Sequence, residues 1–298
     1  MPNAAREGSI DRVNDALLEL DEFNGSYPKD ALDLLLQNRE EAVPHLIRAL
    51  EYLCEDPERC LTEDPRWQRY VFSAFLLGYF RENRAHDPLI KLFSLPGGYV
   101  DSLFGEVITE DLPALLYRTS NGSLDSIKQL ALKKDVGEYI RGAAIEALAL
   151  AVYDVQLDRE DLLDYFASLF KRKDLAEEHS FFWSSIAFSM CDLYPLGYID
   201  IVEQAYKDRL IEPDSVGLGS FKRVLDKGKA KALSKFPEIL HRRDLDLDFH
   251  RNISSWACYR DEDEFSDNML LGSKSYKNRE KRKRKAVKNS KRKNRKQK

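Results

Sequence analysis

The sequence has few cysteines and histidines, and it has no long run of uncharged apolar residues. Among its 298 residues there are four cysteines and five histidines. The cysteines form no CxxC pair, which favours a reducing compartment where thiols pack as small apolar side chains. No stretch approaches the roughly eighteen apolar residues of a membrane span, and the N-terminus lacks the apolar core of a signal peptide. We therefore expect a cytoplasmic protein with no membrane-spanning segment.

Familiar catalytic and metal-binding motifs are also missing. There is no GxSxG, no HExxH and no GxxxxGK[ST], so no residue stands out as a nucleophile or as a phosphate ligand. Two loose groups of cysteine and histidine lack the paired short spacing of zinc ligands. They are His45 with Cys54 and Cys60, and His241 with His250 and Cys258. The sequence therefore predicts no catalytic residue, no metal and no cofactor.

Residues 241–273 form an acidic segment with alternating aspartates from Asp244 to Asp248. Such a pattern could bind calcium, but Phe249 stands where the calcium loop requires glycine, and Ser255 where it requires glutamate. Alternation is typical of extended chain, in which apolar side chains face one side and the aspartates face the other. We expect an extended segment whose apolar side chains, including Phe249, pack on the body of the protein.

Lysine and arginine are unevenly distributed along the chain. Residues 274–298 contain fifteen Lys or Arg and a single acid, Glu280, whereas the rest of the chain carries a net charge of −18. The formal net charge of −4 hides this division between an acidic body and a basic tail. Because the tail has almost no apolar residues, it cannot bury enough surface to fold alone, and we expect it to be disordered.

The basic tail is the most specific functional signal in the sequence. Its clustered charges predict binding to the phosphate backbones of RNA, DNA or ribosomes, without base recognition because Tyr276 is its only aromatic residue. The candidate polyanion-binding residues are Lys281, Arg282, Lys283, Arg284, Lys285, Lys291, Arg292, Lys293, Arg295 and Lys296. The tail could instead fold back onto the acidic body, act as a nuclear import signal, or only raise solubility.

A helix with almost no charge on its surface is expected at residues 137–153. Half of the residues in the stretch 143–152 are alanine, and Glu146 is its only charged residue, so the helix must be covered on most sides. Amphipathic helices are expected before it, at 123–134, and after it, at 158–171. A small-residue helix between two amphipathic helices is typical of stacked helical repeats.

The same pattern recurs along the chain. Ala74, Ala144 and Ala187 lie in comparable small-residue helices, 70 and 43 residues apart, and both intervals suit two-helix units of roughly 34 to 47 residues. The remaining helices are expected at 9–24, 28–36, 40–54, 67–80, 87–95 and 181–193, with a pair at 99–119 and another helix after Pro195. Asp64-Pro65 predicts the start of one of these helices, and 56–64 is expected to be a charged loop.

Four stretches of the sequence resemble a known family. They are Glu-Tyr-Ile-Arg-Gly-Ala-Ala-Ile-Glu-Ala-Leu (138–148), Arg-Glu-Asp-Leu-Leu-Asp-Tyr-Phe (159–166), Phe-Trp-Ser-Ser (182–185) and Cys-Asp-Leu-Tyr-Pro (191–195). Over roughly residues 31–225, the chain resembles the bacterial proteins of unknown function grouped as DUF1186, whose fold is similar to HEAT repeats. The resemblance implies a fold and no activity.

Together these patterns predict an all-α protein. We expect a HEAT-like α-solenoid of antiparallel helix pairs at residues 1–240, an extended acidic segment at 241–273 and a disordered Lys/Arg-rich tail at 274–298. Because solenoids usually bind proteins or peptides, we expect a non-catalytic binding or scaffold protein, whose acidic body binds an unidentified protein partner. The alternative is a hydrolase or modifying enzyme with a site in the groove of the solenoid. No small-molecule substrate and no membrane partner are expected.

Overall fold

The computed structural model describes residues 2–63, 66–96, 98–212, 214–242, 249–254, 256 and 259, and the side chains from residue 11 onward except Asn252. The α-helices are α1 (Pro2–Glu19), α2 (Lys29–Gln37), α3 (Arg39–Glu55), α4 (Pro57–Thr62), α5 (Arg69–Tyr79), α6 (His86–Phe93), α7 (Tyr99–Phe104), α8 (Val107–Glu110), α9 (Leu112–Thr119), α10 (Asp125–Leu132), α11 (Glu138–Tyr153), α12 (Arg159–Phe170), α13 (Phe181–Asp192), α14 (Ile199–Lys207), α15 (Leu218–Asp226), α16 (Lys229–Leu233), α17 (Phe236–Arg242) and α18 (Phe249–Ser254). Three short 3-10 helices are η1 (Asn83–Ala85), η2 (Lys173–Leu175) and η3 (Leu196–Tyr198).

The predicted all-α class is confirmed for this part of the chain. Every regular element described is a helix, and extended pairing among the described residues is limited to one isolated bridge between Glu22 and Trp67. None of the described helices has the length and apolar character that are needed to cross a membrane.

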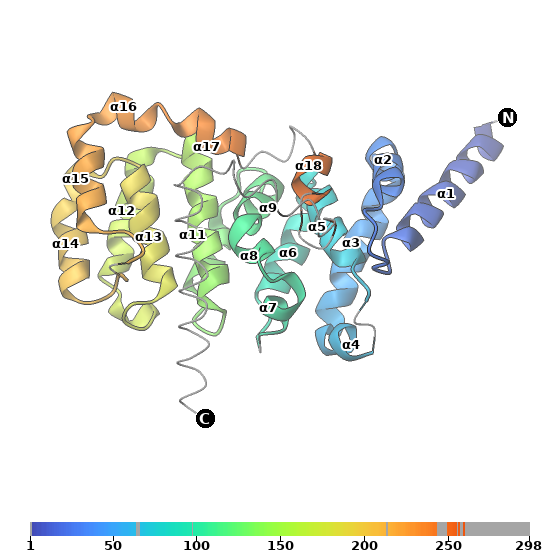
Figure 1. Cartoon of the computed structure of the whole chain (residues 1–298), viewed down its shortest axis with the longest axis horizontal. Coiled ribbons are helices and arrows are strands. Elements are labelled where there is room, and N and C mark those ends of the chain that lie inside the picture. The colour runs from blue at the N-terminus through green and yellow to red at the C-terminus, as the bar shows by residue number, and fades with distance from the viewer. Residues whose placement is uncertain are drawn as a thin grey trace. The chain divides into compact units, whose positions relative to one another are not determined.

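Helix α11 is buried on nearly all sides, as its composition predicts (Figure 1). It packs against α8, α9, α10, α12, α13 and α17, and every residue from 143 to 152 except Glu146 is buried. Gly142 brings α13 close: a Cβ at this position would lie 2.6 Å from Ser185 Oγ and 2.7 Å from Phe181 Cε1. The small residues of α11 therefore set how closely the neighbouring helices can approach.

The helices of residues 1–252 pack largely in chain order. Helix α5 contacts α3 and α9, α11 contacts α9 and α13, and α13 contacts α15. A second set lies beside the first, because α6 contacts α3, α9 and α10, and α12 contacts α13 and α14. Figure 1 shows α11, α12, α13 and α14 side by side. The largest fully buried side chains include Phe72, Phe75, Phe166, Phe182 and Trp183, so the two sets of helices bury aromatic residues between them.

The chain divides into two compact units, residues 1–252 and 253–298. Helix α17 continues past residue 240 and α18 begins at Phe249, so part of the segment predicted to be extended is helical instead. Phe249 is buried, and its ring packs edge-on against Tyr79 with the centroids 5.5 Å apart. A helical turn allows this packing while its backbone groups bond to one another. The run of alternating aspartates lies outside the described residues, and the predicted domain boundaries stay predictions.

Two further helix predictions need correction. The first helix, expected at 9–24, is α1 and spans Pro2–Glu19, so it begins and ends earlier than predicted. The sequence predicts two helices at 99–119, whereas the structure has three, α7, α8 and α9. Gly105 lies in the turn between α7 and α8. The predicted helix start at Asp64-Pro65 lies outside the described residues.

The stretch 56–64 contains a short helix rather than the predicted charged loop. Asp56 caps α4 by accepting a hydrogen bond from the backbone N–H of Arg59 at 3.0 Å, and Pro57 occupies the first helical position. A capping aspartate followed by proline is a strong helix start. Cys60 supplies the buried contact of this helix, so one apolar side chain and a good cap outweigh the density of charge.

Candidate functional site

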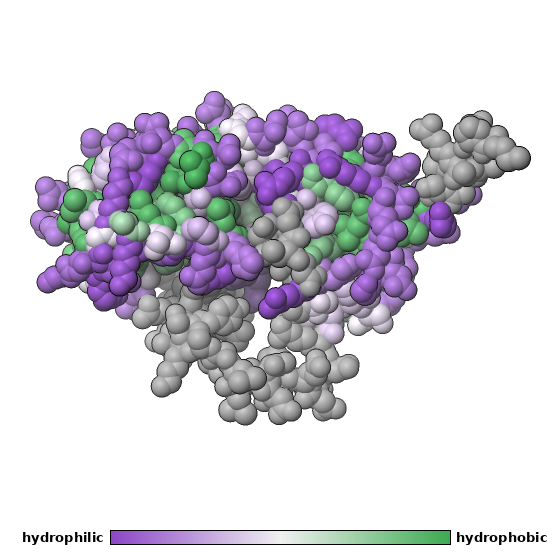
Figure 2. Space-filling model, turned by 90° about the horizontal axis from the view of Figure 1, so that it is seen from above, coloured by the Kyte–Doolittle hydropathy of each residue, from purple (hydrophilic) through white to green (hydrophobic). Residues whose placement is uncertain are grey.

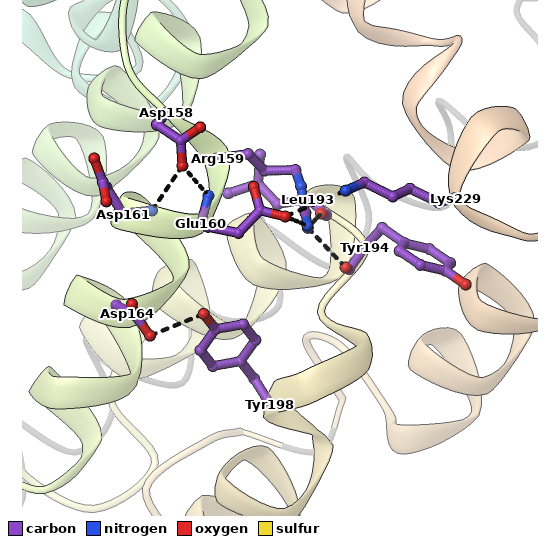
Figure 3. Close-up of polar contacts among 9 residues, drawn as sticks. All are labelled: Asp158, Arg159, Glu160, Asp161, Asp164, Leu193, Tyr194, Tyr198 and Lys229. Carbon is purple, nitrogen blue, oxygen red and sulfur yellow. Dashed lines mark hydrogen bonds and ion pairs between the residues drawn. The ribbon is translucent and has the colours of Figure 1, made fainter.

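The first turns of α12 present acidic side chains to solvent (Figure 3). Asp158 begins the helix, since its Oδ1 accepts hydrogen bonds from the backbone N–H groups of Glu160 (2.8 Å) and Asp161 (3.1 Å). Carboxylates in the first turn also favour the positive end of the helix dipole. Asp158, Glu160, Asp161 and Asp164 are exposed because the leucines and the two phenylalanines of α12 occupy its buried side. These four residues are named the acidic α12 face.

Arg159 lies in the same turn, but its side chain bonds to the end of another helix. Its Nη1 donates to the carbonyl oxygens of Leu193 (2.7 Å) and Tyr194 (2.9 Å), directly after α13. Its Nη2 donates to Glu160, and 14% of the side chain is exposed. A guanidinium at the C-terminal end of a helix satisfies carbonyl groups that have no partner inside the helix, and it complements the helix dipole. Arg159 therefore joins α12 to α13 and is largely withdrawn from solvent.

Two side chains reach the acidic α12 face from neighbouring elements (Figure 3). The Tyr198 hydroxyl donates to Asp164 Oδ1 at 2.8 Å, and Lys229 Nζ lies 3.2 Å from Glu160 Oε1. Desolvation and then the hydrogen bond to Asp164 raise the pKa of Tyr198. Desolvation also acts to raise the pKa of Glu160, but hydrogen bonds from Lys229 and Arg159 outweigh it and lower that pKa. Glu160 is therefore ionised at neutral pH.

The surroundings of this face combine charge with exposed apolar surface. Figure 2 shows a mainly hydrophilic surface with two hydrophobic areas, one of them over the part of the molecule that holds α12 to α16 and the other over its N-terminal helices. Leu196 on η3 is 64% exposed. Each exposed carboxylate gives a cationic partner only a modest attraction, but several together steer association and set orientation. The carboxylates of this face can attract Lys or Arg side chains of a partner, while Leu196 offers the apolar contact between them.

Two other arginines are buried inside the helical core. Arg118 donates from Nε to the Gly78 carbonyl oxygen (2.8 Å) and from Nη2 to the Tyr79 carbonyl oxygen (3.1 Å) at the end of α5. Arg141 donates from Nε to the Ala131 carbonyl oxygen (2.9 Å) at the end of α10, and its guanidinium lies 4.1 Å from the centre of a phenylalanine ring of α13. Burial lowers the pKa of Arg141. Both arginines connect helices rather than face a ligand.

The two loose groups of cysteine and histidine noted in the sequence form no cluster among their described members, and Cys258 lies outside the described residues. Cys54, Cys60 and Cys191 are buried cysteines that form no disulfide among the described residues, and burial raises the pKa of Cys54 to about 11 and of Cys191 to about 12. Such thiols carry almost no thiolate at neutral pH. His250 bonds to Tyr27 (2.8 Å) and Asp33 (2.9 Å) instead of approaching another histidine. Among the described residues, no three His, Cys, Asp or Glu side chains are placed to hold a metal ion.

The ten basic residues predicted to bind polyanions lie outside the described residues, so this site stays a prediction. The acidic α12 face is not among the sites that the sequence predicts. A signal for it exists, because Asp158, Asp161 and Asp164 recur every three residues and so share one side of a helix. No local sequence pattern predicts the partners of Arg159, because the carbonyl oxygens of Leu193 and Tyr194 lie 34 and 35 residues further along the chain.

The fold and this site define an all-α protein with an acidic surface on one of its helices. The sequence pattern of the family described as protein of unknown function DUF1186 matches residues 12–260. The chain therefore belongs to the DUF1186 family, which confirms the resemblance seen in the sequence.

Two relatives come from chlamydiae. The chain is 28% identical over 233 residues to an uncharacterised protein of Chlamydia trachomatis serovar D, covering 78% of this chain and 91% of that protein. It is 27% identical over 233 residues to an uncharacterised protein of Chlamydia muridarum, covering 78% and 92%. No solved structure matches the chain. The comparisons support the family and name no activity.

Proposed function

We propose that this protein is a non-catalytic binding or scaffold protein whose acidic body binds a basic surface of a protein partner. The observation that carries the proposal is the acidic α12 face. Four exposed carboxylates lie there, and of these only Glu160 is paired with cations of the described residues, namely Lys229 and Arg159, whose other contacts are to the end of α13. The exposed Leu196 nearby supplies the apolar contact that a protein partner needs. The cytoplasm is the compartment that we propose, since the few cysteines form no CxxC pair.

The proposed architecture of the body is a HEAT-like solenoid. Its support is the order of packing, in which α5, α9, α11 and α13 contact one another in turn and α6, α10, α12 and α14 accompany them. Helical arrays of this kind expose long surfaces and serve mainly as binding platforms. The proposed binding role follows from this architecture together with the acidic face.

A defined basic peptide tests the acidic face. An oligo-arginine peptide should bind the full chain with an affinity that Asp161→Asn/Asp164→Asn lowers by about threefold to tenfold, because each exposed charge contributes a few tenths to one kcal/mol. The matched control is Asp11→Asn/Asp15→Asn, which removes the same charge from exposed positions on α1. Fluorescence anisotropy at a fixed ionic strength measures all three affinities. Equal losses in the two double variants would mean that only net charge matters, and the proposal for α12 would be wrong.

We propose in addition that the basic tail attaches the protein to RNA, DNA or ribosomes. The support is the concentration of fifteen Lys or Arg in residues 274–298. The full chain and a chain ending at Leu271 should be titrated with labelled RNA across a salt series. We expect only the full chain to bind, with log affinity falling linearly with log salt concentration. If the shorter chain binds equally well, the tail is not the polyanion site.

A further inference from the structure

A polar cleft lies between α3 and two loop segments that pair with each other. The Glu22–Trp67 bridge, together with hydrogen bonds from Phe23 N to Arg66 O (3.2 Å) and from Gln68 N to Asp21 O (3.1 Å), fixes these segments side by side. They face one side of α3 across a volume of about 470 Å³. The lining residues are Asp21, Glu22, His45, Arg48, Ala49, Tyr52, Arg66, Trp67 and Arg69. This size falls in the range of small-molecule sites.

The wall formed by α3 follows from helical spacing. His45, Arg48, Ala49 and Tyr52 are separated by three, one and three residues, which places them on a single side of the helix. Ala49 is buried and forms the floor, whereas His45 and Arg48 are exposed at the rim. The opposite wall carries Trp67, whose ring meets the Tyr52 ring nearly at right angles with the centroids 5.4 Å apart. The cleft therefore offers the surface of an aromatic pair next to cationic groups.

The hydrogen-bond donors of the cleft outnumber the acceptors that face it. Asp21 accepts from Trp67 Nε1 (2.7 Å) and from Arg69 Nη2 (2.5 Å), and Glu22 pairs with Arg66. Arg69 Nε is buried and has no hydrogen-bond partner among the described residues. Two guanidinium groups, those of Arg66 and Arg69, are thus paired with the two lining carboxylates, and the third, that of Arg48, pairs with neither. A buried donor without an acceptor costs free energy, so an anion that reached it would be stabilised.

Arg48 differs from the other two arginines because its partners lie outside the cleft. Its Nη1 is 2.7 Å from Glu55 and 3.5 Å from Glu51, both further along the exposed side of α3. Its Nη2 also donates to Glu55 at 3.3 Å, but the pair lies at the surface, where the side chain is 60% exposed and such an ion pair contributes about 1 kcal/mol or less. Arg48 is thus the cation that can exchange this pair for an anion bound beside the Tyr52–Trp67 ring pair.

We propose that this cleft binds a small organic anion, in which a single carboxylate or phosphate group is attached to a flat ring. The anionic group would bond to Arg48 and Arg66 and approach Arg69 Nε, while the ring would pack against Trp67 and Tyr52. A small ligand fits better than a polyanion, because the chain apart from residues 274–298 carries a net charge of −18 and repels multiply charged partners. The inference does not depend on the proposed function, since the acidic α12 face lies on other helices.

The test uses Trp67 as a reporter in the full chain. Indole-3-acetate and phenyl phosphate are titrated as the carboxylate and phosphate probes, with benzamide as the uncharged ring and acetate as the anion without a ring. Ligand-detected NMR follows binding, and benzoate replaces indole-3-acetate when tryptophan fluorescence is read. We expect saturable binding of the ring-bearing anions and none of the two controls. The tighter of the two anions identifies which group the cleft prefers.

Variants locate the binding within the cleft. Arg66→Gln and Arg48→Gln should each weaken binding about fivefold or more, because each removes a charge-assisted hydrogen bond. The matched control is Arg172→Gln, which removes an exposed arginine that lies 4.0 Å from Asp174 and outside the cleft. Trp67→Phe should abolish the fluorescence change, and thermal melts of every variant check that the fold is intact. No saturable binding, or binding that Arg66→Gln and Arg172→Gln weaken equally, would overturn the inference.

Discussion

Arg118 and Arg159 make the same kind of contact in two very different regions. Each donates to two carbonyl oxygens at the end of another helix, Arg118 to Gly78 and Tyr79, and Arg159 to Leu193 and Tyr194. Arg118 is buried among α5, α9 and their neighbours, whereas Arg159 lies at the surface beside the acidic α12 face. The same chemistry therefore serves two purposes.

The difference shows how one contact can be structural or functional depending on what surrounds it. In the interior, the contact of Arg118 has no exposed carboxylate beside it in the described part of the chain, so this contact only joins helices. At the surface, Arg159 divides its donors between the end of α13 and Glu160, and the carboxylates of Asp158, Asp161 and Asp164 lie beside it without an ion pair to it. The burial of the guanidinium, rather than its hydrogen bonds, separates the two cases.

Alanine at each arginine tests this comparison most directly. Arg118→Ala should lower the free energy of unfolding by about 3 kcal/mol, because buried carbonyl groups lose their partner and the packing loses a long side chain. Arg159→Ala should lower it by about 1 kcal/mol, because water can reach the carbonyl groups after α13. Urea unfolding of the three proteins measures both values. Equal losses would show that burial does not distinguish the two contacts.

Close packing in the interior is tested at Gly142. In Gly142→Val the new side chain would overlap Ser185 Oγ and Phe181, so we expect a loss of about 2 kcal/mol by urea unfolding. The matched control is Gly197→Val, since a Cβ at Gly197 meets no atom within 4 Å. The control should change stability by less than about 0.5 kcal/mol. If Gly142→Val is as stable as the control, α11 and α13 are not packed as described.

The smallest expected effect concerns a neutral group in the interior, His86. Thr119 Oγ1 donates to the Leu115 carbonyl oxygen (2.8 Å), so it accepts from His86 Nδ1–H (3.1 Å), and His86 Nε2 accepts from Ser126 Oγ (2.7 Å). Burial lowers the pKa of His86, with Asp87 opposing this effect. The unfolded chain therefore binds a proton more readily than the folded chain as the pH falls below about 6.5, and stability declines.

His86→Gln should remove the part of the pH dependence of stability that comes from the titration of His86. Thermal melts of both proteins between pH 7.5 and pH 5 check the expectation: the difference in stability between them should shrink as the pH falls. A constant difference over this range would show that His86 titrates equally in the folded and unfolded chains.

The sequence alone predicts those helices whose burial follows from their amino-acid composition. Helix α11 was predicted correctly because a stretch rich in alanine with a single charge must be covered, whatever its neighbours are. The density of charge at 56–64 predicts a loop, but the Asp56 cap and the proline that follows it start a helix at 57–62. In this stretch, the local signal of a helix start outweighs average polarity.

The candidate site was predictable only in part. The spacing of Asp158, Asp161 and Asp164 places them on one side of a helix, and this requires no tertiary information. The withdrawal of Arg159 depends on where α13 ends in space, and the cleft depends on the pairing of Glu22 with Trp67. Contacts between residues so distant in sequence leave no local pattern, so only the folded chain shows them.

The arginine contacts also bear on how modular this chain is. They join residues that lie 10 to 40 positions apart, and each connects a helix to the end of a different helix. Deleting a helix that carries one of these arginines would leave bare carbonyl groups at the end of its neighbour, and deleting the neighbour would leave the guanidinium without these acceptors. The helices are therefore not interchangeable building blocks.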